Sequence, residues 1–127
     1  MQREDVVIVG ARRTAIGDFG GCFREVSSLE LAVAVVEELV RGTGLDKRQI
    51  DEVIFGNCNQ RSDEPNIARC IALAAEMPVE TTGFTIQRQC SSGMQAIVSA
   101  YHEIVLGDAE IVVAGGVESM STAPYLL

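Results

Sequence analysis

A single cysteine, Cys90, stands where the sequence changes from a short apolar run to a long helix-like stretch. The run covers residues 84–86 and the stretch covers residues 94–106, so the thiol is expected at a strand-to-helix turn. The first turn of a helix points unpaired N–H groups outward, and together with the macrodipole they stabilise negative charge on a nearby atom. Cys90 is therefore a candidate nucleophile for covalent catalysis.

The residues that follow Cys90 are small. Ser91, Ser92 and Gly93 leave backbone N–H groups open to a bound carbonyl oxygen. Gly93 also allows another segment of the chain to approach closely. A buried structural cysteine is the alternative, because free cysteine is among the most buried residue types.

Length and composition indicate one globular domain. The chain has 127 residues, of which 47% are hydrophobic, enough to bury a core of ordinary size. Its formal net charge is −8, from 10 Lys and Arg against 18 Asp and Glu, which argues against a nucleic-acid surface. No run approaches the ~20 apolar residues of a membrane span, and no signal peptide is apparent. We expect a cytoplasmic protein with reduced thiols and no membrane partner.

The other cysteines and the one histidine show no functional pattern. Cys22, Cys58 and Cys70 form no CxxC pair and have no metal-ligand spacing with His102, so no metal site is expected. We interpret these three cysteines as packing residues. His102 follows Cys90 by twelve positions, roughly 18 Å along a helix that rises ~1.5 Å per residue, and is expected to be structural or exposed.

Four apolar runs predict strands. They cover residues 5–10, 53–56, 84–86 and 111–114. The first run, closed by Gly10, has the pattern of a central parallel strand buried on both faces. Long polar loops are expected at residues 11–26 and 57–66.

Three helices are expected between these strands, and two of them have a recognisable start. Ser27 and Glu30 have the spacing of a capping box, and Asn66 is a candidate N-cap. The expected helices run from residue 28 to Gly42 or Gly44, over residues 67–75, and over Ser92–Leu106.

The alternation of strands and helices predicts an α/β domain with a largely parallel sheet covered by helices. In such sheets the functional loops gather at the carboxyl ends of the strands. Cys90 is therefore expected to share one edge of the sheet with the loops that contain Arg12, Asn57 and Gly115.

Four segments in order resemble the thiolases, the acyl-CoA C-acetyltransferases, and together they span the chain. Residues 89–97, Gln-Cys-Ser-Ser-Gly-Met-Gln-Ala-Ile, are similar to the family segment that bears the nucleophilic cysteine. Residues 13–21, and residues 56–57 with 66–69, resemble two earlier segments. The fourth match is the family's Gly-Gly-x-Glu-x-Met-Ser signature, which is present here as Gly115, Gly116, Glu118 and Met120 with Ser121.

The resemblance implies one half of the family's α-β-α-β-α layered fold. Residues 1–116 are expected to form the N-terminal α/β domain, and residues 117–127 to begin the next, loop region. No helix pattern follows the last strand, so we expect the sequence to be a piece of a longer polypeptide.

The resemblance also implies an acyl-CoA C-acyltransferase that forms or cleaves 3-ketoacyl-CoA through an acyl thioester on Cys90. Coenzyme A is then a substrate or product, and no cofactor is expected. The backbone N–H of Cys90 would hold an oxyanion, with Ser91, Gly93 and Gln87 supporting the loop. Gln87 stands where the family commonly has asparagine, and Glu118 is expected mainly to tie down loops through backbone N–H groups.

By the same resemblance, a second cysteine and two histidines belong to a later part of the family's chain. None of them has a counterpart here, so this chain alone is expected to be inactive, and the full-length homodimer or homotetramer to be active. A β-ketoacyl synthase-like condensing enzyme is the alternative within the same fold. A scaffold or binding subunit that needs a partner chain is the non-enzyme alternative.

Overall fold

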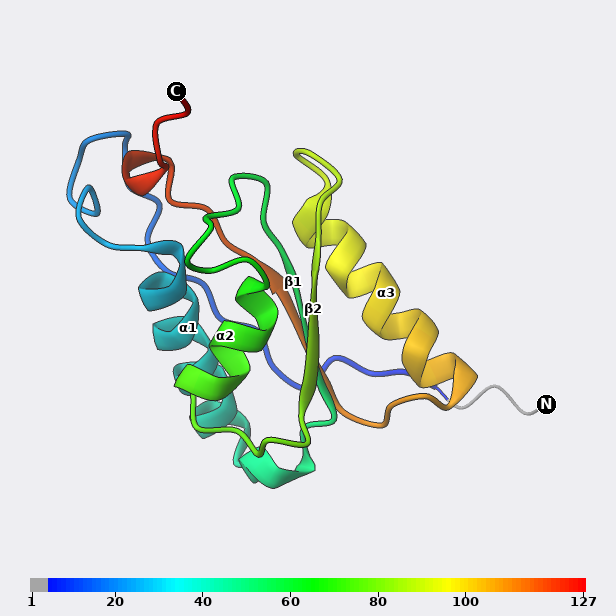
Figure 1. Ribbon diagram of the computed structural model, residues 1–127. Coiled ribbons are helices and arrows are strands. Elements are labelled where there is room, and N and C mark those ends of the chain that lie inside the picture. Colours follow the sequence, from blue (N-terminus) through cyan, green and yellow to red (C-terminus); the bar gives the residue numbers. More distant parts are fainter. Residues whose placement is uncertain (1–4) are drawn as a thin grey trace.

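The computed structural model describes residues 5–127, and its centre is a three-stranded parallel sheet (Figure 1). The strands lie in the order β2-β1-β3, so the first strand in sequence is the middle one. Gly56 is in register with Ile86 on one side and Gly116 on the other, and all three strands therefore end at one level. The strands are β1 (Glu52–Gly56), β2 (Thr82–Ile86) and β3 (Val112–Gly116).

Helices cover both faces of the sheet, as the α/β prediction requires. Figure 1 shows α1 and α2 side by side on one face and α3 alone on the other. The helices are α1 (Ser28–Thr43), α2 (Ile67–Ala74) and α3 (Ser92–Leu106), and short 3₁₀ turns form η1 (Lys47–Gln49) and η2 (Met120–Thr122). None of the helices formed within residues 5–127 combines the length and hydropathy needed to span a lipid bilayer.

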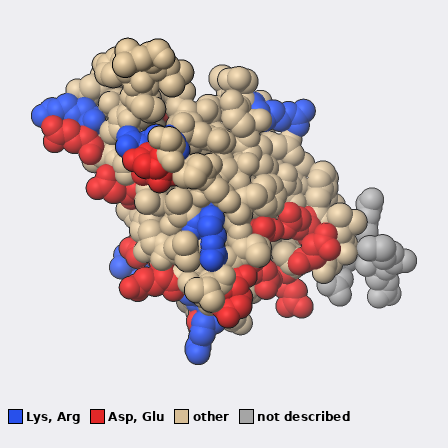
Figure 2. Space-filling model, in the orientation of Figure 1, with Lys and Arg blue, Asp and Glu red and all other residues tan. Residues whose placement is uncertain are grey.

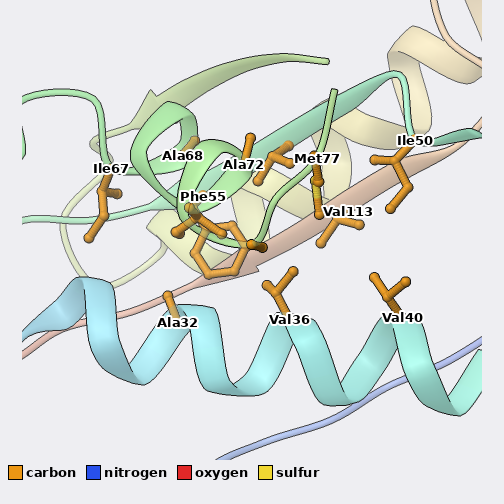
Figure 3. Close-up of a cluster of buried hydrophobic side chains, with 13 residues drawn as sticks. Ala32, Val36, Val40, Ile50, Phe55, Ile67, Ala68, Ala72, Met77 and Val113 are labelled. Carbon is orange, nitrogen blue, oxygen red and sulfur yellow. The ribbon is translucent and has the colours of Figure 1, made fainter. Parts of the chain in front are cut away.

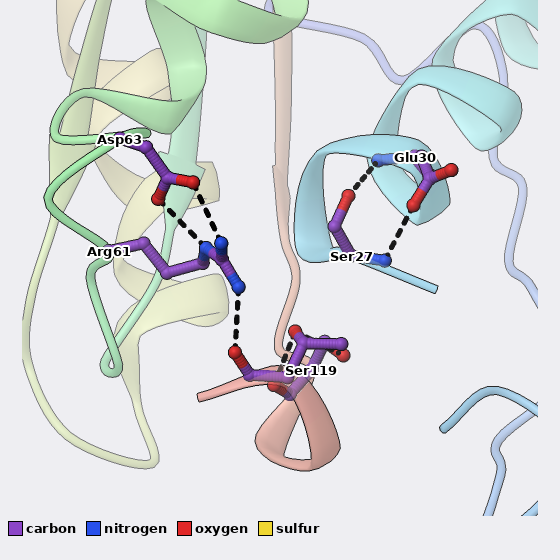
Figure 4. Close-up of polar contacts among 6 residues, drawn as sticks. Ser27, Glu30, Arg61, Asp63 and Ser119 are labelled. Carbon is purple, nitrogen blue, oxygen red and sulfur yellow. Dashed lines mark hydrogen bonds and ion pairs between the residues drawn. The ribbon is translucent and has the colours of Figure 1, made fainter. Parts of the chain in front are cut away.

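The helix starts follow the predicted caps. Ser27 Oγ accepts a hydrogen bond from the Glu30 amide at 3.1 Å, and Glu30 Oε2 accepts one from the Ser27 amide at 2.8 Å (Figure 4). Gly44 ends α1 with a φ of 71°, a left-handed conformation that glycine adopts without strain. At α2 the Asn66 side chain accepts from the Arg69 amide at 3.3 Å. The capping box and the Asn66 cap are confirmed.

Alternate residues of β1 pack into two apolar clusters because successive side chains of a strand point to opposite faces. Val53 and Phe55 belong to the larger cluster, between the sheet and helices α1 and α2 (Figure 3). Ile54 belongs to the smaller one, with Ala96 and Ala100 of α3. The middle strand is thus the one that is buried on both faces.

The prediction of a central strand at residues 5–10 is wrong. This segment pairs with no strand among the described residues, and Val7, Ile8 and Val9 are 68%, 82% and 68% exposed. An apolar run becomes a buried strand only where a neighbouring strand edge and covering helices receive it. The run lies instead along an open apolar cavity of about 560 Å³, whose other walls are formed by β3, α1 and α3.

The end of β3 at Gly116 coincides with the predicted limit of the N-terminal domain. After it the chain forms η2 and continues without further regular structure to residue 127. That residues 117–127 begin a separate region stays a prediction.

Candidate active site

Cys90 lies exposed at the carboxyl edge of the sheet, between the end of β2 and the start of α3. It borders an open cavity of about 430 Å³, which is lined by the ends of β1 and β3 and by the turn that follows β2. The residues that line this pocket are Gly56, Asn57, Cys58, Gln89, Cys90, Ser92, Gly93, Gly116, Val117 and Glu118. The structure therefore brings together three of the four loops that were expected at this edge.

Arg12 does not share this edge, contrary to the sequence-based expectation. Its guanidinium lies against Gly42, near the end of α1 that leads through η1 to the start of β1. Only the later part of the same loop reaches the site's surroundings, where the Gly20 amide donates to Ser121 Oγ at 2.9 Å. The loop is long enough to reach both ends of the sheet. Its place directly after the predicted strand at residues 5–10 was therefore not enough to locate Arg12.

The turn that carries Cys90 is held by its own polar groups. Gln89 has a φ of 50°, which is unusual for a residue other than glycine. Its amide donates to Gln87 Oε1 at 2.7 Å, so the longer side chain at position 87 hydrogen-bonds within the turn. The Ser91 amide donates to the Arg88 carbonyl at 3.1 Å. These contacts fix the peptide units on both sides of the thiol.

Buried Ser92 ties the turn to the start of α3. Its Oγ accepts from the Arg88 amide at 2.8 Å and donates to the Gln89 carbonyl at 2.6 Å. The Ser92 amide also donates to the Gln89 carbonyl, at 3.1 Å. Ser92 is only 4% exposed, so this clamp is shielded from water although Cys90 is not.

Glycines allow the start of α3 to lie against the ends of β1 and β3. A Cβ added to Gly56 would stand 2.6 Å from the Gly93 nitrogen, and one added to Gly116 would stand 3.0 Å from the Gly93 Cα. A Cβ added to Gly93 would meet nothing nearer than 3.7 Å. The close approach predicted for Gly93 is present, but Gly56 is the position that has no room for a side chain.

Glu118 fastens the loop that follows β1. Its carboxylate accepts hydrogen bonds from Asn57 Nδ2 at 3.0 Å, the Cys58 amide at 2.9 Å and the Asn59 amide at 3.0 Å. Asn57, which is 2% exposed, also donates to the Val117 carbonyl at 3.0 Å. The carboxylate thus joins two strand ends, which is the loop-tying role expected for it from the sequence. Met120 lies in η2 and is exposed.

Arg61 holds the far side of the same loop. It pairs with Asp63 at 2.7 Å and donates to the Thr122 carbonyl at 2.7 Å (Figure 4). The hydrogen bonds from Arg61 lower the pKa of the Asp63 carboxyl. Thr122 Oγ1 donates to Ser119 Oγ at 3.0 Å, and Ser119 Oγ donates to the Val26 carbonyl at 2.7 Å. Segments after β1, after β3 and before α1 are therefore linked around the pocket.

Cys58 lies beside the Cys90 turn, a position that sequence reasoning missed. It is half-buried, its Sγ donates to the Gln89 carbonyl at 3.0 Å, and it lies 3.5 Å from Ser92 Oγ. Its place in the sequence, two residues after the end of an apolar strand, could have indicated this position. The interpretation as a plain packing residue does not account for these polar contacts.

The remaining candidates lie away from the pocket. Cys22 is exposed, so its interpretation as a packing residue is wrong. Cys70 is half-buried in α2, and burial raises the pKa of its thiol, in agreement with a packing role. His102 is exposed on α3 with its ring 5.8 Å from that of Tyr101. Within residues 5–127, no group of three or more His, Cys, Asp or Glu is placed to hold a metal ion.

Residues 6–127 match the family model described as the thiolase N-terminal domain. The chain belongs to the thiolase family. This confirms the resemblance to the thiolases that the sequence motifs indicated.

Curated relatives of this thiolase chain carry matching names. The acetyl-CoA acetyltransferase of Syntrophomonas wolfei is 45% identical over 127 residues, which are 100% of this chain and 32% of that protein. A probable acetyl-CoA acyltransferase of Staphylococcus aureus is 42% identical over 122 residues, 96% of this chain and 31% of that protein. The chain thus spans about a third of the length of these relatives.

Solved thiolase structures confirm the fold. The crystal structure of the Bacillus anthracis acetyl-CoA acetyltransferase superposes with a TM-score of 0.93 at 57% identity, over 95% of this chain and 31% of that one. The structure of the Acat5 thiolase of Ascaris suum in complex with coenzyme A superposes with a TM-score of 0.94 at 38% identity, over 98% of this chain and 32% of that one. The predicted α/β thiolase fold is therefore correct.

Proposed function

We propose that Cys90 is the nucleophile of an acyl-CoA C-acyltransferase, a thiolase that forms or cleaves 3-ketoacyl-CoA. The observation that carries this proposal is the exposed Cys90 thiol at the start of α3, on an open pocket lined also by the ends of β1 and β3. Thiolates are good nucleophiles and good leaving groups toward carbonyl carbons. The names of the relatives, acetyl-CoA acetyltransferase and acetyl-CoA acyltransferase, support the same chemistry.

The reaction would proceed in two halves. In the cleavage direction the Cys90 thiolate attacks the ketone carbon of a 3-ketoacyl-CoA, the bond between C2 and C3 breaks, and the released carbanion takes a proton to become acetyl-CoA. The acyl group stays on Cys90 as a thioester. The thiolate of free coenzyme A then attacks this thioester and regenerates Cys90. Dividing the exchange in this way avoids a complex of three reacting molecules.

The Cys90 amide is our candidate donor to the oxyanion that forms in each attack. The carbonyl of the preceding residue, Gln89, accepts hydrogen bonds from the Ser92 amide, Ser92 Oγ and Cys58 Sγ. In a trans peptide the C=O and N–H groups point in opposite directions. The N–H of Cys90 is therefore directed away from Ser92 and Cys58, and a donor fixed beforehand in this way is what an oxyanion site requires. Ser91, Gly93 and Gln87 would act by shaping this turn.

We propose that the rest of the polypeptide supplies the proton transfer. The one histidine of this chain is exposed and does not line the pocket, so it is not a partner for Cys90. We infer that this chain alone is inactive, and that the full-length thiolase acts as a homodimer or homotetramer.

Coenzyme A would be held mainly by residues beyond this chain. It carries phosphate groups, which basic side chains bind. On the face in Figure 2 the Lys and Arg side chains are scattered and form no single patch, and several of them lie beside acidic ones. We propose that coenzyme A is a substrate or product with no separate cofactor, and that the protein is cytoplasmic.

The proposal is tested by trapping the intermediate on the full-length gene product. The enzyme is mixed with acetyl-CoA and quenched in acid, and the acetylated peptide is located by mass spectrometry. We expect the acetyl group on Cys90, and we expect Cys90→Ser to abolish both the acetylation and CoA-dependent cleavage of acetoacetyl-CoA. Cys22→Ser is the matched control, since this exposed thiol lines no part of the pocket. Acetylation of a different residue, or full activity of the Cys90→Ser variant, would refute the assignment.

A further inference from the structure

Two thiols from different loops line one pocket. Cys58 follows β1 and Cys90 follows β2, which is the neighbouring strand. The sulfur of Cys58 lies 3.0 Å from the carbonyl oxygen of Gln89, and that carbonyl belongs to the peptide unit whose nitrogen is Cys90's own. The two other cysteines of the chain, Cys22 and Cys70, do not line this pocket.

The contact with Gln89 limits the distance between the two cysteines. Standard bond lengths place a carbonyl oxygen about 2.8 Å from the Cα of the next residue. The Cys58 sulfur therefore lies within about 6 Å of the Cys90 Cα, given its 3.0 Å hydrogen bond. In a disulfide each sulfur lies about 4 Å from the Cα of the other cysteine, because the S–S bond is about 2.05 Å long. Rotation of the side chains together with a movement of the exposed turn by about 2 Å at most would therefore join the sulfurs.

We propose that Cys58 is the resolving cysteine for Cys90, so that a peroxide converts the pair into a Cys58–Cys90 disulfide. The Cys90 thiolate attacks one oxygen of hydrogen peroxide, which breaks the O–O bond, releases hydroxide and leaves Cys90 as a sulfenic acid. The Cys58 thiolate then attacks this sulfur, forms the S–S bond and expels the second hydroxide. The two thiol protons neutralise the hydroxides, so two thiols and one peroxide give one disulfide and two waters.

The disulfide would block the nucleophile reversibly. A sulfenic acid without a resolving thiol goes on to sulfinic acid, which thiol reductants do not restore. Cys58 is half-buried, whereas Cys90 is exposed, so peroxide reaches Cys90 first and Cys58 acts second. The inference uses the proposed function in one respect only, namely that loss of Cys90 stops the reaction.

The first test locates the bond in the full-length gene product. The protein is treated with hydrogen peroxide under native conditions, its free thiols are blocked with N-ethylmaleimide, and it is digested with trypsin and Glu-C. Cys58 and Cys90 then fall in the separate peptides 53–61 and 89–103, each with one cysteine. We expect these two peptides to be linked, and the link to disappear on reduction. Attachment of Cys90 to a cysteine beyond residue 127, or sulfinic acid at Cys90 with Cys58 free, would overturn the proposal.

The second test compares the recovery of activity in Cys58→Ser and in the matched control Cys22→Ser. Each variant is treated with peroxide and then with dithiothreitol, and its activity is expressed relative to its own untreated value. We expect wild type and Cys22→Ser to recover fully, and Cys58→Ser to recover several-fold less with sulfinic acid on Cys90. Equal recovery in all three would contradict a resolving role. If the linked peptides form while activity is unaffected, the disulfide stands and the proposed function of Cys90 fails.

Discussion

The nitrogen of Gly93 in α3 lies so close to Gly56 at the end of β1 that a Cβ on Gly56 would approach it to 2.6 Å. The first turn of α3 can reach the strand end only because residue 56 has no side chain. The Cys90 turn leads directly into α3, which begins at Ser92. The contact between Gly93 and Gly56 therefore also fixes how far the Cys90 turn lies from the end of β1.

We expect Gly56→Ala to destabilise the full-length protein by about 1–3 kcal/mol, the usual effect of forcing extra atoms into a packed interior. Acyl transfer should fall as well, because α3 must move to admit the methyl group. The measurement is denaturant unfolding together with the cleavage assay. Gly93→Ala is the matched control for the unfolding measurement, because its Cβ would meet nothing nearer than 3.7 Å. Equal stability of the two variants would show that this packing is not tight in solution.

Replacing Glu118 by Gln should loosen the loop after β1. The substitution turns one acceptor oxygen into a donor amide, which then faces the Asn57 side chain or the amides of Cys58 and Asn59. Asn57 is buried and Cys58 is half-buried, and leaving a buried polar group without a partner costs about 1–3 kcal/mol. We expect a lower free energy of unfolding and weaker acyl transfer. Glu25→Gln serves as control, since that side chain is exposed, and an equal effect of both substitutions would argue against the loop-tying role.

Iodoacetamide should modify Cys90 before the other cysteines of this chain in the full-length protein. Cys90 is exposed at the start of a helix, Cys58 and Cys70 are half-buried, and exposed Cys22 lies in a turn with no helix N-terminus beside it. Time-resolved peptide mapping gives the order of labelling. Prior incubation with acetyl-CoA should slow the labelling of Cys90 alone. Faster labelling of Cys22 would remove the case for a specially reactive thiol.

The stability of the protein should depend on pH through Glu103. A hydrogen bond to the Glu52 carboxyl, together with burial and the charges of Glu52 and Asp108, raises the pKa of Glu103 from 4.5 to about 7. A raised carboxyl pKa means that the folded state holds the proton more tightly than the unfolded state. The stabilisation of the folded state by protonated Glu103 is therefore complete below about pH 4.5, and it is lost as the pH rises through about 7.

Glu103→Gln tests this dependence, because glutamine is neutral at every pH and can donate to Glu52. We expect the variant to melt at a higher temperature than wild type at pH 8, and the difference to vanish by pH 4. Glu80→Gln, at an exposed position, should show no such pattern. A melting-temperature difference that does not change between pH 4 and pH 8 would contradict the raised pKa.

Local signals in the sequence were sufficient to predict where the helices lie. The Ser27 and Glu30 pair begins α1 with both predicted hydrogen bonds, and α3 covers Ser92–Leu106 as expected. These predictions succeed because caps and helical periodicity are properties of neighbouring residues. The sheet edge that gathers Cys90, Asn57 and Gly116 was predictable too, because parallel strands place their carboxyl ends together.

Features that depend on distant parts of the chain were not predictable in the same way. Residues 5–10 have the composition of a buried strand, but composition does not say which strand edge receives them. The contact of Cys58 with Gln89 joins residues 31 positions apart, and the direction of a side chain just beyond a strand end is not readable from spacing. Arg12 was misplaced because a long loop reaches both ends of the sheet.

The carboxylate of Glu118 bonds to partners 59 to 61 positions earlier in the chain. Bringing the two ends of so long a segment together costs conformational entropy. The pairing of β3 with the sheet offsets this cost, and contacts between neighbouring residues do not. The loop contacts beside Cys90 therefore need β3 in place, because their acceptor, Glu118, follows that strand. A nascent chain that stops before residue 118 has the Cys90 thiol without these contacts.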